Sequence, residues 1–555
     1  MTARPGRGLP RRSVLQLGLF ALAGAPLLAG CGVTGAPAPR AAGGPPRRGG
    51  TLRFAILDAP ANLDPHSGSS YPESIITTNT SDKLTYQDPR TGEILPWLAT
   101  SWQVNNTLTE YTFQLREGVS FSDGTPFTAD SVKENFDILG LGNKQLGVAK
   151  VTAYWSDYLG TRVLGSHTVV VSFNKPNAGF LQATSHYFSG IVGHSTLLKS
   201  KAERARPENI VTTGPFTVAE HVYQERTVLV RRPDYNWAPP GSAHSGPAYL
   251  DRVEFLVIPE ASVRTGALHS GDIHASLDVQ PTDEKPLAAS GFQVLSQLIA
   301  GRDIAFDFRL DKPPTDEWAV RRAVQLGWDR AALRKAVLTD SYRISTSLIA
   351  QNVPGYQPFD AISYRPDEAV RVLEEAGWTL RGSTDGIRVR NGKPLVIEML
   401  GGANLVINTP AYELIQQYLK KIGIQLNLTV LPLADWVAEQ TIKGKWNINA
   451  GNTSRADPAV LDQLYSPLIA NNGKLAKDFP GNPDLVGSLA AIETTLDPAK
   501  RAEITARAQD LLLNTYALTA PVYTPAQVVA ASPKVHDLRF EIQSRNLFYD
   551  TWIES

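Results

Sequence analysis

The sequence has very little sulfur and no excess of charge of either sign. Its 555 residues include one cysteine and two methionines, and 54 basic side chains are balanced by 54 acidic ones. A single cysteine excludes an internal disulfide and a zinc site built from thiolates. The balanced charge provides no electrostatic basis for capturing nucleic acid. We therefore expect a globular protein that binds no nucleic acid and whose only thiol, Cys31, acts alone.

Long hydrophobic runs are also absent, apart from one short apolar stretch near the N-terminus. Residues 14–30 are interrupted by glycines and a proline, and they are weaker than the ~20 apolar residues that a stable membrane span needs. The stretch follows the pair Arg11-Arg12 and ends directly before Cys31. These features resemble a twin-arginine export signal and a bacterial lipobox, whose cysteine is acylated.

From these motifs we predict that residues 1–30 are a signal peptide that is removed on export. Cys31 would then carry a lipid anchor that holds the protein at the outer face of the bacterial cytoplasmic membrane. The alternative is an incidental cysteine with no such role. The signal contains four arginines and no acidic residue, so the mature chain would be slightly acidic.

The rest of the chain is too long for one hydrophobic core. Residues 31–50 are rich in glycine, proline and alanine, which predicts a flexible tether. A single core stops growing at roughly 250–300 residues, so the remainder should form at least two lobes. Clefts between lobes are common ligand sites.

Hydrophobic periodicity predicts both strands and helices in the folded part. The clearest unit is a strand at 395–400, a helix at 411–422 and a strand at 424–430, which together predict a right-handed βαβ crossover. A second helix is predicted from 498 to about 514, after the capping aspartate of an Asp-Pro pair. Alternating apolar residues over 111–121 predict a β-hairpin.

Several longer motifs follow one another in a fixed order along the mature chain. They are Leu63–Pro65, Asp88–Trp102, Tyr111–Val119, Phe121–Ala129, Thr213–Phe216 and Ala376–Trp378. In type and order they resemble the extracytoplasmic solute-binding proteins of ABC importers, in the oligopeptide, dipeptide and nickel family. Each motif also has a structural interpretation, such as the turn chemistry of Asp123–Pro126, so the resemblance identifies the scaffold and says little about the solute.

The resemblance implies an α/β fold, a two-lobed periplasmic-binding-protein-like clamshell of type II, cluster C, with an extra inserted domain. The implied boundaries are 51–70, 200–297 and 520–555 for the first lobe, 71–199 for the inserted domain, and 298–519 for the second lobe. Two crossing strands, near 298–305 and 518–523, would form the hinge.

The resemblance further implies a monomeric receptor that captures a small peptide or peptide-like solute by lobe closure and delivers it to permease and ATPase subunits. The sequence contains no Gly-x-Ser-x-Gly elbow, phosphate-binding Gly-Lys-Ser loop or His-Glu-x-x-His helix, so we expect no enzymatic activity and no cofactor. Three alternatives remain open: a receptor for an opine, a metal chelate or a sugar, a sensory receptor on the same scaffold, and a hydrolase that uses two carboxylates.

The most informative segment for ligand binding is 449–458. Asp457-Pro458 has the pattern of a helix cap and first turn, which favours a structural role for Asp457. Peptide-binding relatives usually carry an aspartate three positions earlier, which pairs with the free amino group of the ligand. Here that position is Ser454, and a neutral hydroxyl cannot replace such an ion pair.

Arg455 precedes the expected helix N-terminus, where backbone N–H groups and the helix dipole favour anions. It therefore suggests a carboxylate-bearing or otherwise anionic solute. The alternatives for Arg455 are a surface position or a salt bridge between the lobes.

Aromatic residues complete the candidate site, although core packing is the alternative for each of them. Among the nine histidines only His269 and His274 are closely spaced, and the glycine between them disfavours a helical metal pair, so we predict no dedicated metal site. A metal bound as an anionic chelate would need no protein ligand. The ligand-binding candidates are Asn452, Ser454, Arg455, Asp457, Tyr187, Trp155, Trp436, Trp446 and Tyr523.

Overall fold

The structure is a computed structural model, which describes residues 44–66, 70–466 and 483–554 apart from positions 382, 384, 404, 441 and 443. The predictions for residues 1–43, including the signal peptide and the lipid anchor on Cys31, lie outside the described residues. Within the described ranges, no helix combines the length and apolar character needed to cross a bilayer.

A first sheet of seven strands is built from both ends of the folded chain. Its central strand pairs in parallel with one neighbour on each side, and the outer strands pair antiparallel. In sheet order the strands are β12 (Gln293–Leu298), β21 (Ala526–Ala531), β11 (Ala275–Ser276), β1 (Thr51–Ile56), β10 (Arg252–Val257), β9 (Arg226–Arg231) and β8 (Phe216–Val222). Helices α6 (Ala261–Ser270) and α7 (Pro281–Ala289) follow β10 and β11 in the chain.

Residues between β1 and β8 form a separate four-stranded antiparallel sheet. Its order is β4 (Ala99–Val104), β5 (Glu110–Leu115), β7 (Thr168–Phe173) and β6 (Tyr158–Gly165), and α2 (Ala129–Leu141) packs against β6 and β7. The short elements around it are α1 (Tyr71–Thr80), β2 (Thr85–Gln87), β3 (Ile94–Pro96), α3 (Thr152–Trp155), α4 (Phe180–Ala183) and α5 (His194–Leu197). One continuous hydrophobic core contains residues from this sheet and from the first sheet.

The predicted hairpin over 111–121 is wrong. Strand β5 pairs with β4 and β7 and not with residues 119–121. The reason is a local turn, because the backbone N–H of Phe121 donates to the carbonyl of Thr125 at 2.8 Å and Ser120 forms only a single bridge to Pro126.

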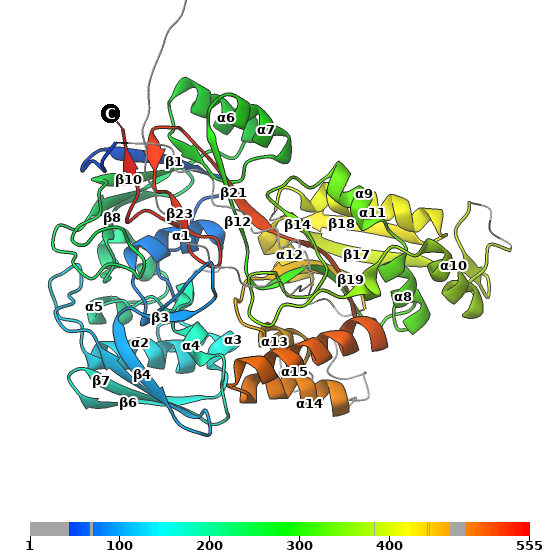
Figure 1. Cartoon of the computed structure of the whole chain (residues 1–555), viewed down its shortest axis with the longest axis horizontal. Helices are drawn as coiled ribbons and strands as arrows, with labels where there is room; N and C mark the ends of the chain where they lie inside the picture. Colours follow the sequence, from blue (N-terminus) through cyan, green and yellow to red (C-terminus); the bar gives the residue numbers. More distant parts are fainter. Residues whose placement is uncertain are drawn as a thin grey trace, which may run out of the picture. The chain divides into compact units, whose positions relative to one another are not determined.

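A second sheet of six strands packs in a second hydrophobic core, which also contains residues of β1, β21, α6 and α7. In sheet order the strands are β14 (Arg343–Ile344), β20 (Thr519–Thr524), β13 (Arg302–Phe308), β19 (Ile448–Thr453), β17 (Val396–Gly402) and β18 (Gln425–Leu431). The helices of this part are α8 (Trp318–Leu326), α9 (Arg330–Ala336), α10 (Pro366–Glu375), α11 (Asn408–Lys421), α12 (Leu433–Glu439), α13 (Val460–Tyr465), α14 (Pro483–Thr494) and α15 (Pro498–Asp510). Figure 1 shows α14 beside α15, which pack against each other.

The predicted βαβ unit is confirmed. Strands β17 and β18 pair in parallel along their whole length, and α11 connects them. The helix begins three residues before the predicted start, so Pro410 takes the third helical position, which still needs no backbone donor. The predicted helix at 498 is also confirmed, and the Asp497 side chain caps it by accepting from the N–H of Lys500 at 2.8 Å.

Two short connections join the two larger sheets. Strand β12 continues into β13 through residues 299–301, and β20 continues into β21 through Pro525, with β12 beside β21 (Figure 1). The N–H of Ile299 donates to the Pro525 carbonyl at 2.8 Å, so the connections are adjacent. The boundary predicted at 520 falls inside β20, because β20 pairs with β13 in the second sheet as far as Tyr523. The chain therefore leaves the second sheet about five residues later than predicted.

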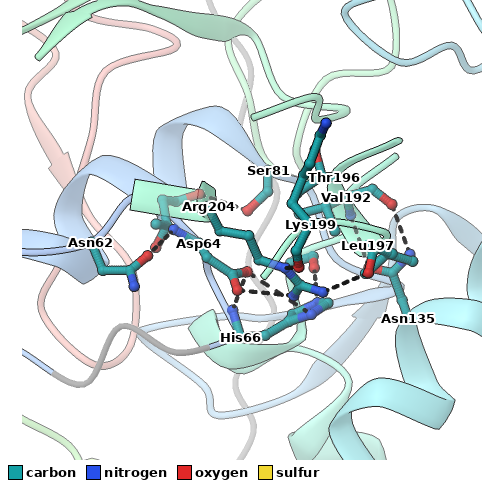
Figure 2. A network of polar contacts seen from close by, with 12 residues as sticks. Asn62, Asp64, His66, Ser81, Asn135, Val192, Thr196, Leu197, Lys199 and Arg204 are labelled. Atoms are coloured by element: carbon teal, nitrogen blue, oxygen red, sulfur yellow. Dashed lines mark hydrogen bonds and ion pairs between the residues drawn. The ribbon is translucent and has the colours of Figure 1, made fainter. Parts of the chain in front are cut away.

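A buried ion pair holds the loop after β1 in place (Figure 2). The side chains of Asp64 and Arg204 are completely buried, and Oδ2 of the first lies 3.0 Å from Nη1 of the second. The guanidinium also donates to the carbonyls of Leu197 and Lys199. Burial lowers the pKa of the nearby His66 imidazole, which contacts the Gly190 carbonyl at 3.0 Å. This buried ion pair and the hydrogen bonds of its guanidinium give Leu63–Pro65 a scaffold role.

Candidate solute-binding site

Ser454 lies at a junction of three distant segments. It follows the last residue of β19, and its hydroxyl accepts a hydrogen bond from Nη1 of Arg545 at 3.2 Å. Its carbonyl accepts from Nε2 of Gln543 at 3.2 Å and contacts Nε2 of His186 at 3.5 Å. The second sheet, the inserted segment between β1 and β8, and the C-terminal segment after β21 therefore meet at this residue.

The His186 imidazole is neutral at this junction. Burial, reinforced by the charge of Arg545, holds the pKa of His186 well below its ordinary value. Its Nδ1 accepts from the N–H of Phe188 at 3.3 Å, so the proton lies on Nε2, which faces the Ser454 carbonyl. The positive charge at the junction is therefore that of Arg545.

Arg545 also lies at this junction, although the sequence did not predict it as a ligand-binding residue. Its side chain is almost fully buried, with 4% of the residue exposed. The guanidinium carbon lies 4.2 Å from the ring centre of Tyr187 and 5.1 Å from that of Tyr71. Its nitrogens donate to the Ser74 hydroxyl at 3.0 Å and to the Gln543 carbonyl at 2.6 Å.

In the part of the chain that the structure describes, no carboxylate oxygen lies within 4.0 Å of the Arg545 guanidinium. A buried charge that has only neutral acceptors and aromatic faces is poorly compensated. A guanidinium binds a carboxylate through two parallel hydrogen bonds, so an acidic ligand group is its natural partner. The arrangement can therefore hold an anion.

Arg455 has a different environment. It is 2% exposed, which excludes the alternative of a surface position. Its guanidinium stacks on Tyr154 at 4.1 Å, and Nη2 lies 3.4 Å from Oε1 of Glu493. Burial raises the pKa of Glu493 to about 7, and the adjacent Arg455 opposes this rise. Arg455 lies between β19 and α13 and Glu493 lies in α14. Both residues fall within the range predicted for the second lobe, so this pair is not the salt bridge between lobes that was the other alternative.

Asp457 lies in the turn between β19 and α13. Its carboxylate oxygens lie 2.7 and 2.8 Å from the guanidinium nitrogens of Arg501, and one of them accepts from the N–H of Ala459 at 2.8 Å. Burial by itself would raise the pKa of Asp457, but the adjacent Arg501 outweighs it and holds the pKa below its usual range. These bonds give Asp457 a structural role in the turn that leads into α13.

The predicted aromatic residues are divided between the junction and the hydrophobic cores. Tyr187 lies at the junction, against Arg545. Trp155 is instead completely buried in the first core, with its ring 4.8 Å from that of Phe136. Tyr523 is buried in the second core, and its hydroxyl donates to Asn408 at 2.5 Å.

The two remaining tryptophan candidates make contacts elsewhere on the second sheet. Trp436 on α12 covers β19 at Gly451, where a Cβ atom would come within 2.8 Å of the indole ring. Trp446 donates its indole N–H to the Glu439 carbonyl at 3.2 Å. Asn452 is half-buried in β19, two residues before Ser454.

The two closely spaced histidines serve other contacts. Nδ1 of His274 accepts from the N–H of Arg53 at 3.0 Å, and the His269 ring packs edge-on against Phe292. Within the described residues, no group of three histidine, cysteine, aspartate or glutamate side chains is placed to hold a metal ion.

Gly179 brings the inserted segment against the Arg455 turn. The N–H of Ala178 donates to the Glu493 carbonyl at 2.8 Å. A Cβ atom on Gly179 would lie 2.9 Å from Nη2 of Arg455 and 3.4 Å from Oδ1 of Asp457. The close approach of the two segments therefore depends on the absence of a side chain at this position.

Known proteins similar in sequence are binding proteins. The nickel-binding periplasmic protein of Escherichia coli (strain K12) is 29% identical over 356 residues, which cover 61% of this chain and 63% of that protein. The match thus spans less than two thirds of the nickel-binding protein. The periplasmic murein peptide-binding protein MppA of the same strain is 23% identical over 525 residues, 85% of this chain and 90% of that protein. The prediction that this chain is not an enzyme agrees with these relatives.

Solved structures show the same fold. NikA from Brucella suis in complex with Fe(III)-EDTA has a TM-score of 0.77 at 23% identity, and the match covers 91% of this chain and 100% of that one. The oligopeptide-binding protein AppA from Bacillus subtilis in complex with a nonapeptide has a TM-score of 0.76 at 18% identity, covering 92% and 100%. The predicted two-lobed α/β fold of periplasmic binding proteins is confirmed.

A family-level match agrees with both comparisons. The model described as bacterial extracellular solute-binding proteins, family 5 (middle), matches residues 93–474. This range covers more than half of the chain and contains the Ser454 turn and the βαβ unit of the second sheet. The chain belongs to the bacterial extracellular solute-binding proteins of family 5.

Proposed function

We propose that this protein is the lipid-anchored receptor of an ABC importer and that its solute is a small carboxylic acid bound by Arg545. One observation supports an acidic solute: the Arg545 guanidinium is buried between two tyrosine rings and is not paired with any carboxylate of the described chain. A solute carboxylate would supply the missing countercharge and two charge-assisted hydrogen bonds.

Ser454 supports the same choice of solute. At this position relatives usually carry an aspartate that pairs with a free amino group, but here the hydroxyl accepts from Arg545. An ammonium placed at the junction would face a guanidinium and lack an anionic partner, which disfavours peptides recognised through their amino end. Acids such as opines, peptide-like acids and anionic metal chelates fit better than neutral sugars. The Fe(III)-EDTA complex held by the Brucella relative is a chelate of this kind.

Lobe closure would couple binding to transport. A solute that contacts Arg545 and the Ser454 turn touches both sides of the junction. It shifts the populations of the open and closed forms to the extent that it binds one form more tightly than the other. Permease and ATPase subunits would then recognise the closed form. A sensory receptor would use the same closure, and neighbouring genes for a kinase in place of permeases would favour that role.

Native mass spectrometry of freshly purified mature protein tests the proposed solute. We expect a copurified acid that is chemically unchanged after the protein is denatured. A thermal-shift panel of dipeptides, opines, sugars and metal-EDTA complexes should then show stabilisation by acids, since a ligand stabilises by RT ln(1 + [L]/Kd). A neutral solute would contradict the proposal, and a cleaved product would favour a hydrolase.

Replacing Gly179 with alanine should weaken solute binding about tenfold. The added Cβ would come within 2.9 Å of Arg455 and hold the inserted segment away from the turn, at a cost of about 1–2 kcal/mol. Isothermal titration with the copurified solute measures the change. Gly266→Ala is the control, because a Cβ on this residue of α6 meets nothing within 4 Å. Equal dissociation constants for the two variants would contradict this role of Gly179.

Replacing Cys31 with alanine should release the protein from the membrane. Acyl chains anchor by ~0.8 kcal/mol per buried methylene, and the variant lacks the thiol that would carry them. Cell fractionation should find Cys31→Ala in the soluble fraction with its solute affinity unchanged, while Thr34→Ala stays in the membrane fraction. Membrane-bound Cys31→Ala would rule out the anchor.

A further inference from the structure

A small cavity lies beside the Arg545 junction. Its volume is about 20 Å³, which exceeds the ~10–15 Å³ needed to hold one water-sized group. The cavity is formed by α1, by the residues that follow it and by the C-terminal segment. Its lining residues are Thr78, Lys83, Tyr86, Gln87, Trp97, Ser185, Glu541, Ile542 and Leu547.

Three polar side chains in this lining are buried, namely those of Thr78, Lys83 and Gln87. Within the described ranges, Thr78 Oγ1 and Gln87 Oε1 have no hydrogen-bond partner. The Lys83 ammonium makes no hydrogen bond or ion pair with the described residues. It lies 5.7 Å from the centre of the Trp97 ring, and the nearby charges of Glu541 and Asp82 partly offset the effect of burial, which lowers the pKa of Lys83. Each of the three residues is at most 5% exposed. Leaving buried polar groups unpaired is unfavourable, so the cavity is prepared for a polar occupant.

The orientation of the Gln87 amide is determined by its other contacts. Its nitrogen donates to the carbonyls of Gly92 and Ala456, both at 3.1 Å. The amide oxygen is therefore the atom left without a partner. The cavity thus offers donors on Lys83 and Thr78, and acceptors on Gln87 and Glu541.

We propose that this cavity is a second subsite, which receives one hydroxyl group of the solute. A hydroxyl has one donor and two acceptor lone pairs, so it can accept from both Lys83 and Thr78 and donate to Gln87. A carboxylate oxygen would face the Glu541 carboxylate, and an ammonium would face Lys83. This subsite rests on the proposed function, and it narrows the solute class to hydroxylated carboxylic acids.

The position of the cavity relative to Arg545 supports one solute occupying both. Ser74, which accepts from Arg545, and Thr78 are four residues apart on α1 and lie on the same face, about 6 Å from each other. Gln87 bonds the Ser454 turn through the Ala456 carbonyl, and Ile542 directly precedes Gln543, which also contacts Ser454. The hydroxyl should therefore lie a few bonds from the carboxylate.

The variant Thr78→Val tests the subsite. Because the Thr78 hydroxyl has no hydrogen-bond partner among the described residues, its removal should leave the melting temperature unchanged or slightly higher. Dissociation constants are measured for pairs of acids that differ by hydroxyl against hydrogen: malate and succinate, and seryl and alanyl dipeptides. We expect the wild type to prefer the hydroxylated member of a pair about tenfold, and Thr78→Val to bind both members equally.

A second variant, Lys83→Met, removes the other donor and should abolish the same preference. The subsite is overturned if the wild type binds both members of every pair equally, or if the preference survives in Thr78→Val and in Lys83→Met. The variant Arg545→Gln distinguishes failure of the subsite from failure of the proposed function. If this variant binds every acid more weakly than the wild type, but the wild type does not prefer the hydroxylated member of any pair, only the subsite is wrong. If no acid binds the wild type, both proposals are wrong.

Discussion

Replacing Arg204 with methionine is expected to lower the free energy of unfolding by about 3–5 kcal/mol. Both Arg204 and Asp64 are completely buried and 3.0 Å apart (Figure 2). Methionine retains most of the apolar volume of the side chain but leaves the Asp64 carboxylate buried without its cation. The Leu197 and Lys199 carbonyls also lose their donor. Urea denaturation followed by tryptophan fluorescence measures the change.

An exposed ion pair provides the control for this prediction. Arg90 pairs with Asp88 at 3.5 Å, but its side chain is 85% exposed, and such pairs contribute about 0–1 kcal/mol. Arg90→Met should therefore unfold almost like the wild type. If Arg204→Met is no less stable than Arg90→Met, the ion pair does not hold the loop after β1, and the scaffold role of Leu63–Pro65 is wrong.

Replacing Arg545 with glutamine is expected to weaken binding of the natural solute about 10- to 100-fold. The variant loses the charge-assisted part of a bond to the solute carboxylate, worth about 1.5–3 kcal/mol. Glutamine can still donate to the Ser74 hydroxyl or the Ser454 hydroxyl. Because Arg545 has no carboxylate partner in the described chain, its removal leaves no protein charge unpaired. Titration calorimetry gives the affinity, and the melting temperature reports on folding.

Two further arginine variants distinguish the effect of the charge at position 545 from the effect of the planar guanidinium shape and from a loss of protein stability. Arg545→Lys keeps the charge but loses the planar fork, so its affinity should lie between those of the wild type and Arg545→Gln. Arg455→Gln breaks the pair with Glu493, so it should lower the melting temperature more than Arg545→Gln does. An unchanged dissociation constant for a folded Arg545→Gln would exclude this residue from the site.

Short-range patterns explain why much of the fold could be predicted. The unit β17, α11 and β18 matches its prediction to within three residues at each boundary, because strand and helix periods appear directly in the order of apolar side chains. The cap at Asp497 was likewise a local feature. The hairpin over 111–121 failed because strand partners are chosen across the sheet, where β7 supplies the neighbour that residues 119–121 do not.

The candidate site was predicted only in part, for a geometric reason. Tyr154 and Trp155 are neighbours in the short helix α3, where adjacent side chains point in directions about 100° apart. Both side chains belong to the first core, and the Tyr154 ring also stacks against the Arg455 guanidinium. No property of the sequence distinguishes these two aromatic residues. Their roles depend on which side of α3 faces the junction.

The amino-acid sequence alone determined the family and the unit of β17, α11 and β18, because these follow from motifs and from contacts between near neighbours. Only the tertiary structure decided which arginine is paired with a carboxylate of the described chain. Arg455 is paired by Glu493, 38 residues away, whereas Arg545 reaches Ser454 from 91 residues away and has no carboxylate partner in the described chain. How well a buried charge is stabilised depends on the groups around it in space, and the chain brings those groups together only when it folds.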